Sequence, residues 1–367
     1  MIDDLMDDLR RRMTGERSGQ LTVAEAGEAA TIAAIRQAAP SEINGDDAAV
    51  LDPAPPNSRY IATTDVLVDG VHFRFDWSTP YEVGVKAVTQ NFADIQAMGG
   101  RPAAVLLSLA APGDLPLDTV RDIAAGIGST AAPWAVELVG GDVVTSKQLV
   151  ISITAIGSLS GPDAALTMGA AQPGHQVIAS GVIGHSAAGE SILRYFGSRE
   201  AVPEDPVLQE LVRRHCAPTL VVGRGAVARA AGVRAMTDNS DGLLKDLTTL
   251  ARRSNVSIDL DGAALTPDAQ LYYAAEVLGA DPWKWILTGG EDHTLLATTD
   301  QEPPAGYRFL GMVGEGHNED PSDANGEKSP DADATTRIGA TPTVTVDGQI
   351  PAYTGGWDSM GPGGDCQ

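Results

Sequence analysis

Hydrophobic positions recur along the chain at both helical and strand spacing, and they predict a chain of mixed helices and strands. The most clearly marked helix begins at the capping box Thr79-Pro80-Tyr81-Glu82 and ends at Gly99 and Gly100. Other helices are predicted near residues 32–35, 120–127, 187–196, 220–231 and 243–253. Strands are predicted at residues 60–68, 103–110, 135–139, 149–156, 176–180, 256–260, 294–297 and 307–313. This order is typical of an α/β (α+β) protein.

The length of the chain indicates more than one domain, because 367 residues exceed what one hydrophobic core usually organises. We place one domain at residues 21–160 and a second at 170–357, on either side of a stretch rich in Gly, Pro and Ala. Three polar segments have few apolar side chains and are predicted to lie outside the cores. They are a flexible arm at 1–20, a disordered insertion at 317–336 and a tail at 358–367.

Composition excludes several classes of function. No apolar run approaches the roughly 20 residues that span a membrane, and the first residues lack the pattern of a signal peptide, so a cytoplasmic protein is expected. A formal charge of −24 repels phosphate backbones, which argues against nucleic-acid partners. Cys216 and Cys366 lie far apart and form neither a disulfide framework nor a CxxC metal site.

Candidate chemistry is concentrated in five short segments that place carboxylates in polar surroundings at the edges of apolar elements. The segments are Gly45-Asp46-Asp47-Ala48, Thr63-Thr64-Asp65, Asn91-Phe92-Ala93-Asp94, Gly140-Gly141-Asp142 and Asp238-Asn239-Ser240-Asp241-Gly242. Each segment alone is also typical of an ordinary turn or helix cap. Taken together, they favour Mg²⁺, which prefers a few carboxylates, waters and substrate phosphate oxygens. Because the chain has no GxxxxGK[ST] loop, phosphate binding is expected to depend on metal ions and backbone N–H groups.

Six segments in the same order resemble the thiamine-monophosphate kinase family, part of the aminoimidazole-ribonucleotide-synthetase-like ATP-binding superfamily. They are GDDAAVL at 45–51, TTDVLVDGVHF at 63–73, KAVTQNFADIQAMGGRP at 86–102, ELVGGDVV at 137–144, DNSDGLLKDL at 238–247 and LTGGEDHTLL at 287–296. GGWDSM at 355–360 is a weaker match. The resemblance extends over residues 27–357.

The resemblance implies an N-terminal domain whose strands form a barrel across a homodimer, and a C-terminal α/β sandwich domain. It also implies transfer of the ATP γ-phosphate to thiamine monophosphate, giving thiamine diphosphate. The expected Mg²⁺ ligands are Asp46, Thr63, Thr64, Asp65, Asp94, Asp142, Asp238 and Asp241. Of these, Asp94, Asp142 and Asp241 are expected to carry the catalysis. Gly141, Asp142 and Ser240 would contact ATP, and His72, Glu291 and Trp357 would contact the thiamine substrate.

The chain departs from the family pattern at several positions near the nucleotide and substrate motifs. Met168 stands where the family usually has an arginine, His175 replaces an acidic residue, and His293 replaces an aromatic one. Ser359 and Met360 also differ from the usual ending. The metal-binding set is intact, whereas positions expected to meet ATP and the substrate differ from the family pattern.

Two alternatives remain open from the sequence. One is another ATP-dependent enzyme of the superfamily, such as a cyclising synthetase, a selenophosphate synthetase or a hydrogenase-maturation dehydratase. The other is a non-catalytic nucleotide sensor, against which the clustered carboxylates argue. Because no nucleophile stands beside an evident base, direct in-line transfer without a phosphoenzyme is predicted.

Overall fold

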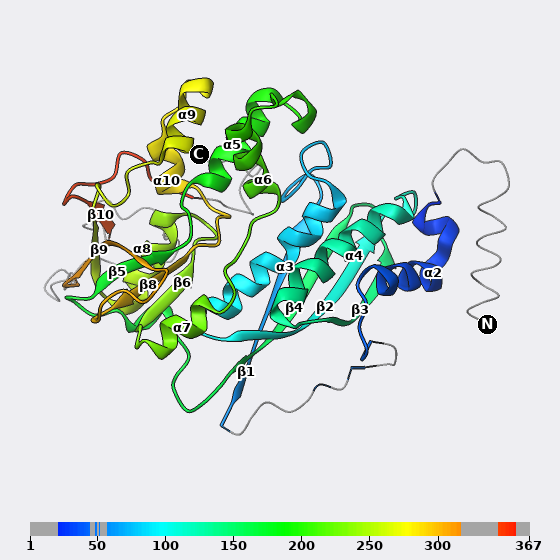
Figure 1. Ribbon diagram of the computed structural model, residues 1–367, viewed down its shortest axis with the longest axis horizontal. Helices are drawn as coiled ribbons and strands as arrows, with labels where there is room; N and C mark the ends of the chain where they lie inside the picture. The colour runs from blue at the N-terminus through cyan, green and yellow to red at the C-terminus, as the bar shows by residue number, and fades with distance from the viewer. Residues whose placement is uncertain (1–20, 45–47, 50, 52–56, 317–343, 357–367) are drawn as a thin grey trace, which may run out of the picture.

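The computed structural model describes residues 21–44, 48–49, 51, 57–316 and 344–356. In these residues, two β-sheets with their flanking helices form two adjoining halves (Figure 1). The predicted arm, insertion and tail lie outside the described residues. None of the helices in the described part of the chain is long and apolar enough to cross a membrane.

The first half is a four-stranded sheet in the order β1-β4-β2-β3, with helices along one face. Its strands are β1 (Arg59–Val68), β2 (Arg101–Ala111), β3 (Leu138–Thr145) and β4 (Val150–Leu159), and its helices are α2 (Val23–Ala38), α3 (Pro80–Ala97) and α4 (Leu117–Ala131). β4 shows why only one face is covered: Ile151, Ile153 and Ala155 are buried, whereas the residues between them are less buried. In a strand, alternate side chains point to opposite faces, so these residues pack under α3 and α4 while the other face stays open.

The helix α3 has both halves of the predicted capping box. The Thr79 hydroxyl accepts from the Glu82 backbone N–H, and the Glu82 carboxylate accepts from the backbone N–H of Thr79. Two glycines let α3 and α4 approach closely. A Cβ atom at Gly84 would lie 2.0 Å from the carbonyl oxygen of Ile123. A Cβ atom at Gly126 would likewise lie 2.0 Å from the carbonyl oxygen of Tyr81. The crossing of the two helices therefore has no room for larger side chains.

We expect Gly84→Ala to destabilise the protein by about 2–3 kcal/mol, because the added methyl meets backbone that cannot move aside. Thermal or denaturant unfolding would measure the loss. Gly128→Ala, in α4, is the matched control, since its Cβ would come no closer than 3.3 Å to another atom. If Gly84→Ala unfolds like the wild type, the described crossing is wrong.

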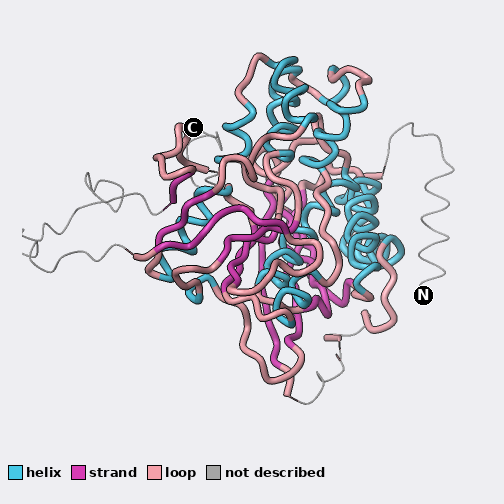
Figure 2. The backbone as a smooth tube through the Cα atoms, turned by 60° about the vertical axis from the view of Figure 1, so that its left-hand side comes forward, coloured by secondary structure: helices cyan, strands magenta, loops and turns pink. Residues whose placement is uncertain are grey.

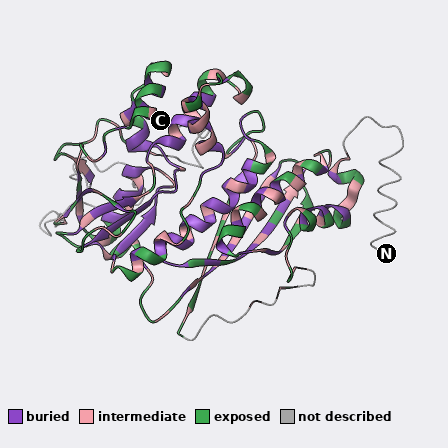
Figure 3. Ribbon diagram, viewed as in Figure 1, coloured by how far each residue is buried: buried purple, intermediate pink, exposed green. Residues whose placement is uncertain are grey.

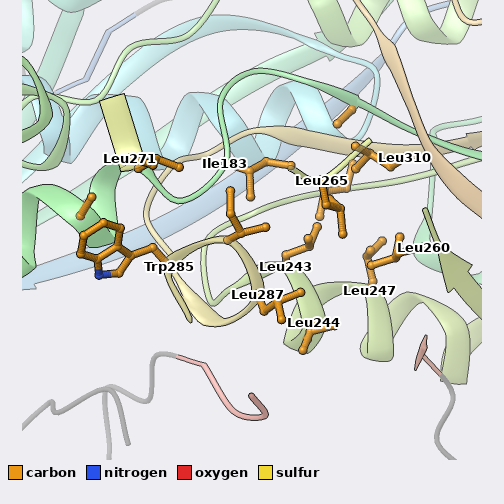
Figure 4. Close-up of a cluster of buried hydrophobic side chains, with 14 of the residues drawn as sticks. Ile183, Leu243, Leu244, Leu247, Leu260, Leu265, Leu271, Trp285, Leu287 and Leu310 are labelled. Carbon is orange, nitrogen blue, oxygen red and sulfur yellow. The ribbon is translucent and has the colours of Figure 1, made fainter. Parts of the chain in front are cut away.

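The second half is a six-stranded sheet in the order β10-β7-β9-β5-β8-β6. Its strands are β5 (Gln176–Ser180), β6 (Ala235–Asp238), β7 (Ser257–Leu260), β8 (Leu295–Thr299), β9 (Arg308–Gly314) and β10 (Val344–Val346). Its helices are α5 (His185–Phe196), α6 (Pro206–Cys216), α7 (Arg224–Ala230), α8 (Leu243–Ser254), α9 (Ala269–Leu278) and α10 (Pro282–Thr288). Leucines of α8, among them Leu243 and Leu247, pack with Leu260, Leu310 and Trp285 in the core of this half (Figure 4).

The helix α3 connects the two halves. It is buried along most of its length (Figure 3) and contacts β1, β2 and β4 on one side and β6, β8 and α7 on the other. At its C-terminal end, the Gln96 side chain accepts a hydrogen bond from the backbone N–H of Gly225 in α7. Figure 2 shows the strands (magenta) gathered in the middle of the molecule, with helices (cyan) above and to one side. Residues on the C-terminal turns of α3 therefore face the ends of strands from both sheets.

Several element predictions were wrong in extent. A strand was predicted at 135–139, but β3 extends over Leu138–Thr145. Ala135 ends a short 3₁₀ helix and has a left-handed φ of 55°, so the extended strand begins only after it. The segment Gly140-Gly141-Asp142 therefore lies inside a strand and not in a turn. A Cβ at Gly141 would lie 1.8 Å from the Leu107 carbonyl oxygen, so glycine is needed there for the close approach of β2. The helix predicted at 220–231 is shortened to α7, and α6, α9, α10, β6 and β10 were not predicted.

Candidate active site

Three carboxylates from both halves meet at the C-terminal part of α3. Asp65 comes from β1, Asp94 from α3, and Asp238 from the end of β6. We call these three residues the acidic centre. The pKa of Asp94 is raised to about 7, mainly by burial and then by the carboxylates of Asp238 and Asp65, while a 2.6 Å hydrogen bond from the Thr63 hydroxyl opposes the rise. Burial, with a smaller contribution from Asp238, also raises the pKa of Asp65.

The buried His293 is a member of this site that the sequence reasoning identified only as a departure from the family pattern. Its Nδ1 lies 3.1 Å from a carboxylate oxygen of Asp238. Burial alone would lower the pKa of His293, but the hydrogen bond to Asp238 and the negative charges of Asp238 and Glu291 together outweigh burial, and the pKa is raised. The imidazole therefore compensates part of the negative charge of the acidic centre.

Two loops are joined by their backbones beside the acidic centre. The N–H of Glu291 donates to the carbonyl of Ser240 at 2.8 Å, and the N–H of His293 donates to the carbonyl of Asn239 at 3.1 Å. Glu291 and His293 have left-handed φ values of 60° and 52°, which are uncommon for residues other than glycine. A Cβ at Gly290 would lie 2.3 Å from the Ser240 carbonyl oxygen, so this junction needs glycine. The loops 238–242 and 289–294 thus act as one unit.

The start of α8 holds a further group of acidic side chains. Asp246 accepts hydrogen bonds from the backbone N–H groups of Asp241 and Gly242. The pKa of Asp246 is raised to about 8, mainly by burial and then by the neighbouring carboxylates of Asp238 and Asp241. The Asp241 carboxylate forms a 2.9 Å ion pair with Lys245. Asp241 and Ser240 lie on the loop that begins at Asp238 and leads into α8, next to the acidic centre.

A second pocket adjoins the loop 289–294 on the side of the first half. Its lining includes His72, Trp77, Glu190, Arg194, His215 and Glu291, and we call it the His72 pocket. The two described residues predicted to contact the thiamine substrate, His72 and Glu291, are thus brought together. Burial lowers the pKa of His72, whose Nδ1 accepts a hydrogen bond from the Val68 backbone N–H. Burial would raise the pKa of Glu291, but the ion pair with Lys86, together with the nearby His215 and His293 rings, overcomes this, and the pKa falls to about 2. Glu291 is a permanent carboxylate in this pocket near neutral pH.

Two predicted metal ligands lie apart from the acidic centre. Thr64 lies between Thr63 and Asp65 on β1, so its side chain points to the open face, where its hydroxyl donates to the Ile153 carbonyl. Asp142 of β3 lies opposite Ser108 of β2, which lies opposite Ser152 of β4, which lies opposite Val66 of β1. Side chains in such a row across a sheet share one face, and the exposed Val66 shows that this is the open face. Asp142 is therefore exposed on β3, at the opposite edge of the sheet from β1, and one chain does not bring it to Asp65. Gly141 lies beside it, with Gly140 and Arg36, in a pocket under α2.

The remaining predicted residues fall outside what the structure describes. Asp46 and Trp357 belong to segments that the structure does not describe, so their predicted roles stay predictions. Among the described residues, no three His, Cys, Asp or Glu side chains are arranged to hold a metal ion as they stand. The acidic centre gathers partly buried carboxylates that repel each other, which suits a cation, but the described residues do not close a ligand shell around one.

Comparison with known proteins identifies the family. The sequence pattern of the N-terminal domain of AIR synthase related proteins matches residues 45–159. The thiamine-monophosphate kinase of Corynebacterium glutamicum is 49% identical over 339 residues, covering 92% of this chain and 95% of the relative. The chain belongs to the thiamine-monophosphate kinase family. The family member of Mycobacterium tuberculosis is 43% identical over 273 residues, 74% of this chain and 79% of the relative.

Solved structures of thiamine-monophosphate kinases have the same fold. The kinase of Stenotrophomonas maltophilia K279a has a TM-score of 0.70 at 29% identity, with 87% of this chain and 96% of that chain covered. A structure described as AaThiL complexed with AMPPCP and TMP has a TM-score of 0.67 at 29% identity, covering 90% and 96%. The mixed α/β fold with two sheets agrees with these relatives. In the described residues each sheet is open, so a barrel across two chains is not seen in the single chain.

The departures from the thiamine-monophosphate kinase pattern have distinct positions in the structure. Met168 packs against the core of the second half, and its carbonyl accepts from the Ser254 hydroxyl. His175 is buried between the turn before β5 and β8, where its Nδ1 lies 3.4 Å from the Thr298 hydroxyl. Of Met168, His175 and His293, only His293 contacts the acidic centre, through Asp238. Met168 and His175 therefore have structural roles, and the other two departures, Ser359 and Met360, lie outside the described residues.

Proposed function

We propose that the protein transfers the γ-phosphate of ATP to the phosphate of thiamine monophosphate and so forms thiamine diphosphate. The observation that carries the proposal is the shared loop 289–294, which gives Glu291 to the His72 pocket and His293 to the acidic centre. A substrate bound in the pocket would place its phosphate beside the carboxylates. The relative in complex with AMPPCP and TMP supports this pair of substrates.

Magnesium fits the acidic centre by its donor chemistry. Asp65, Asp94 and Asp238 are hard oxygen donors; Thr63 lies on β1 with Asp65, and Asp241 lies on the loop that follows Asp238. When bound, Mg²⁺ would neutralise the negative charge of the phosphates. The side chains of this chain orient the site: Thr63 holds Asp94, and His293 holds Asp238. Ser240 and Gly141 are proposed to contact ATP. We propose direct in-line transfer, because the Ser186 hydroxyl that meets the His215 ring is buried and does not line the His72 pocket.

Magnesium should stabilise the protein more at pH 8 than at pH 6. The pKa of Asp94 is raised in the folded protein to about 7. The contribution of Asp94 to the free energy of unfolding therefore falls as the pH rises toward 7, and it is least favourable above pH 7. Mg²⁺ binds the ionised form and relieves the repulsion, so its stabilising effect grows through this range. Thermal shift with and without MgCl₂ measures it. A shift that is equal at both pH values would contradict the role of Asp94, and Asp94→Asn should abolish the dependence.

We propose that two chains pair through their sheets and complete the site. β1 and β3 are the two edges of the first sheet, and unpaired edges invite pairing with another strand. The open face also exposes Tyr60, Val66 and Val144. Pairing of β1 with β3 of a second chain would close the predicted barrel and bring the partner's Asp142 to β1, the strand that carries Asp65. The separation of Asp142 from the acidic centre within one chain supports this arrangement.

The predicted domain division is also part of the proposal. All strands of the first sheet precede residue 160 and all strands of the second follow residue 175, which agrees with domains at 21–160 and 170–357. The first would supply the dimer interface and most metal ligands, and the second the loops that meet the substrates. The cytoplasmic location expected from the sequence stays a prediction.

The acceptor assignment is tested by offering thiamine and thiamine monophosphate separately, each with Mg-ATP, and separating the products by chromatography. We expect phosphorylation of thiamine monophosphate only. If thiamine is phosphorylated and thiamine monophosphate is not, the enzyme phosphorylates an alcohol and not a phosphate group. Mg-ATP binding without turnover of either compound would retain the nucleotide site and reject the acceptor.

A further inference from the structure

Lys86 is among the largest fully buried side chains in the described part of the protein and is the only buried lysine there. It lies on α3 with 1% of its surface exposed. Its ammonium donates to the Glu291 carboxylate at 2.9 Å and to the backbone carbonyl of His72 at 3.2 Å. The same group thus contacts both loops that line the His72 pocket, and it connects them to a rigid helix that continues to Asp94.

Packing alone does not account for a lysine here. Removing an ammonium group from water is costly, and a buried ion pair is often no more stabilising than apolar side chains of similar volume. The neighbours of Lys86 on α3, such as Val83 and Ala87, are ordinary core residues, and a methionine could fill the same space. The positive charge therefore has a use that packing does not supply.

The other groups around Glu291 cannot replace that charge. His215, on α6, lies 3.6 Å from the Glu291 carboxylate and also meets the Ser186 hydroxyl at 3.2 Å. Burial, helped by Lys86, lowers the pKa of His215 to about 3, so it is neutral near pH 7. Glu190, on α5, adds a second carboxylate, which Arg194 pairs. Of the groups that face Glu291 in the described residues, Lys86 is the buried cation in direct contact.

We propose that Lys86 is a positioning residue for the acceptor substrate, holding the Glu291 carboxylate and the His72 loop in the geometry that binds thiamine monophosphate. The inference rests on the proposed function. The left-handed backbone at Glu291, with a φ of 60°, makes this support necessary, since such a conformation persists only where its surroundings hold it. Lys86 touches no reacting atom; it acts through Glu291 and the His72 carbonyl.

Four variants test the proposal: Lys86→Met, Lys86→Arg, Glu291→Gln and the double variant Lys86→Met with Glu291→Gln. In Lys86→Met we expect the KM for thiamine monophosphate to rise about 10-fold to 100-fold, as expected from the loss of a hydrogen bond to a charged group. The KM for ATP should change little, since the acidic centre is built by other residues. Lys86→Arg keeps the charge and should recover part of the affinity.

The double variant separates positioning from simple stability. If Lys86 acts through Glu291, the double variant binds thiamine monophosphate no more weakly than Glu291→Gln alone, because the shared interaction is lost only once. It also leaves no unpaired buried charge, so it should fold even if Lys86→Met does not. Lys284→Met, at an exposed position of α10, controls for the loss of one lysine charge and should match the wild type.

Acceptor binding measured by calorimetry gives a readout independent of turnover. Unchanged affinity for thiamine monophosphate in folded Lys86→Met, or additive losses in the double variant, would overturn the inference. A wild type that neither binds nor phosphorylates thiamine monophosphate would overturn the proposed function and this inference with it. A wild type that is active while Lys86→Met loses only thermal stability would overturn the inference alone.

Discussion

Asp94→Asn is expected to lower the turnover of thiamine monophosphate by about a thousandfold or more, since it removes one charge from the centre where metal and phosphate meet. The substitution keeps the shape of the side chain and an oxygen that can accept from the Thr63 hydroxyl. Because the pKa of Asp94 is raised by burial and by Asp238, removing its charge relieves repulsion in the folded protein. The variant should therefore unfold at the same temperature as the wild type or at a higher one.

This combination of lost activity and retained stability distinguishes a metal ligand from a structural carboxylate. Asp122→Asn, on an exposed position of α4, is the matched control and should leave both properties unchanged. A coupled assay gives the turnover, and thermal unfolding gives the stability. Turnover of Asp94→Asn within a few-fold of the wild type would remove Asp94, and with it the acidic centre, from the mechanism.

A heterodimer of two inactive variants is expected to regain about half of the wild-type activity. In the proposed dimer each site combines Asp94 of one chain with Asp142 of the other. Asp94→Asn and Asp142→Asn homodimers should both be inactive. In a heterodimer, one site contains both substitutions and the other contains neither, so one of two sites is intact.

The experiment uses co-expression of the two variants with different affinity tags and purification through both tags. Recovery of activity would require a composite site, because no chain in the heterodimer carries both carboxylates. If the heterodimer is as inactive as its parents, Asp142 and Asp94 do not serve one site across an interface. A protein that purifies only as a monomer would contradict the barrel as well.

Helix-capping residues predicted where a helix starts, because that start is fixed by residues close together in the sequence. The capping box and Pro80 located the start of α3 correctly, because the side chain and the ring fix the first helical turn. The same kind of signal marks two helices that were missed: Asp205 before Pro206 in α6, and Asp281 before Pro282 in α10. The register of β3 was not predictable from hydrophobicity, since its second half is exposed at a sheet edge and depends on the pairing of Gly141 with Leu107.

The candidate site was predictable in its composition but not in its grouping. The segments that supply Asp65, Asp94 and Asp238 were found from residue type, yet only the fold shows that α3 brings them together. The two-residue period of a strand could have separated Thr63 from Thr64, since adjacent side chains cannot share one face. Nothing local could identify His293 or Lys86, because their partners Asp238 and Glu291 lie 55 and 205 positions away.

The central claim is that the γ-phosphate of ATP ends on thiamine monophosphate, and one labelling measurement tests it most directly. The purified protein is incubated with γ-labelled ATP, MgCl₂ and thiamine monophosphate, with and without EDTA, and the products are separated by chromatography. We predict that the label appears in thiamine diphosphate, that EDTA prevents it, and that none stays on the protein. Label found only in inorganic phosphate or on the protein, or ATP left untouched, would contradict the account.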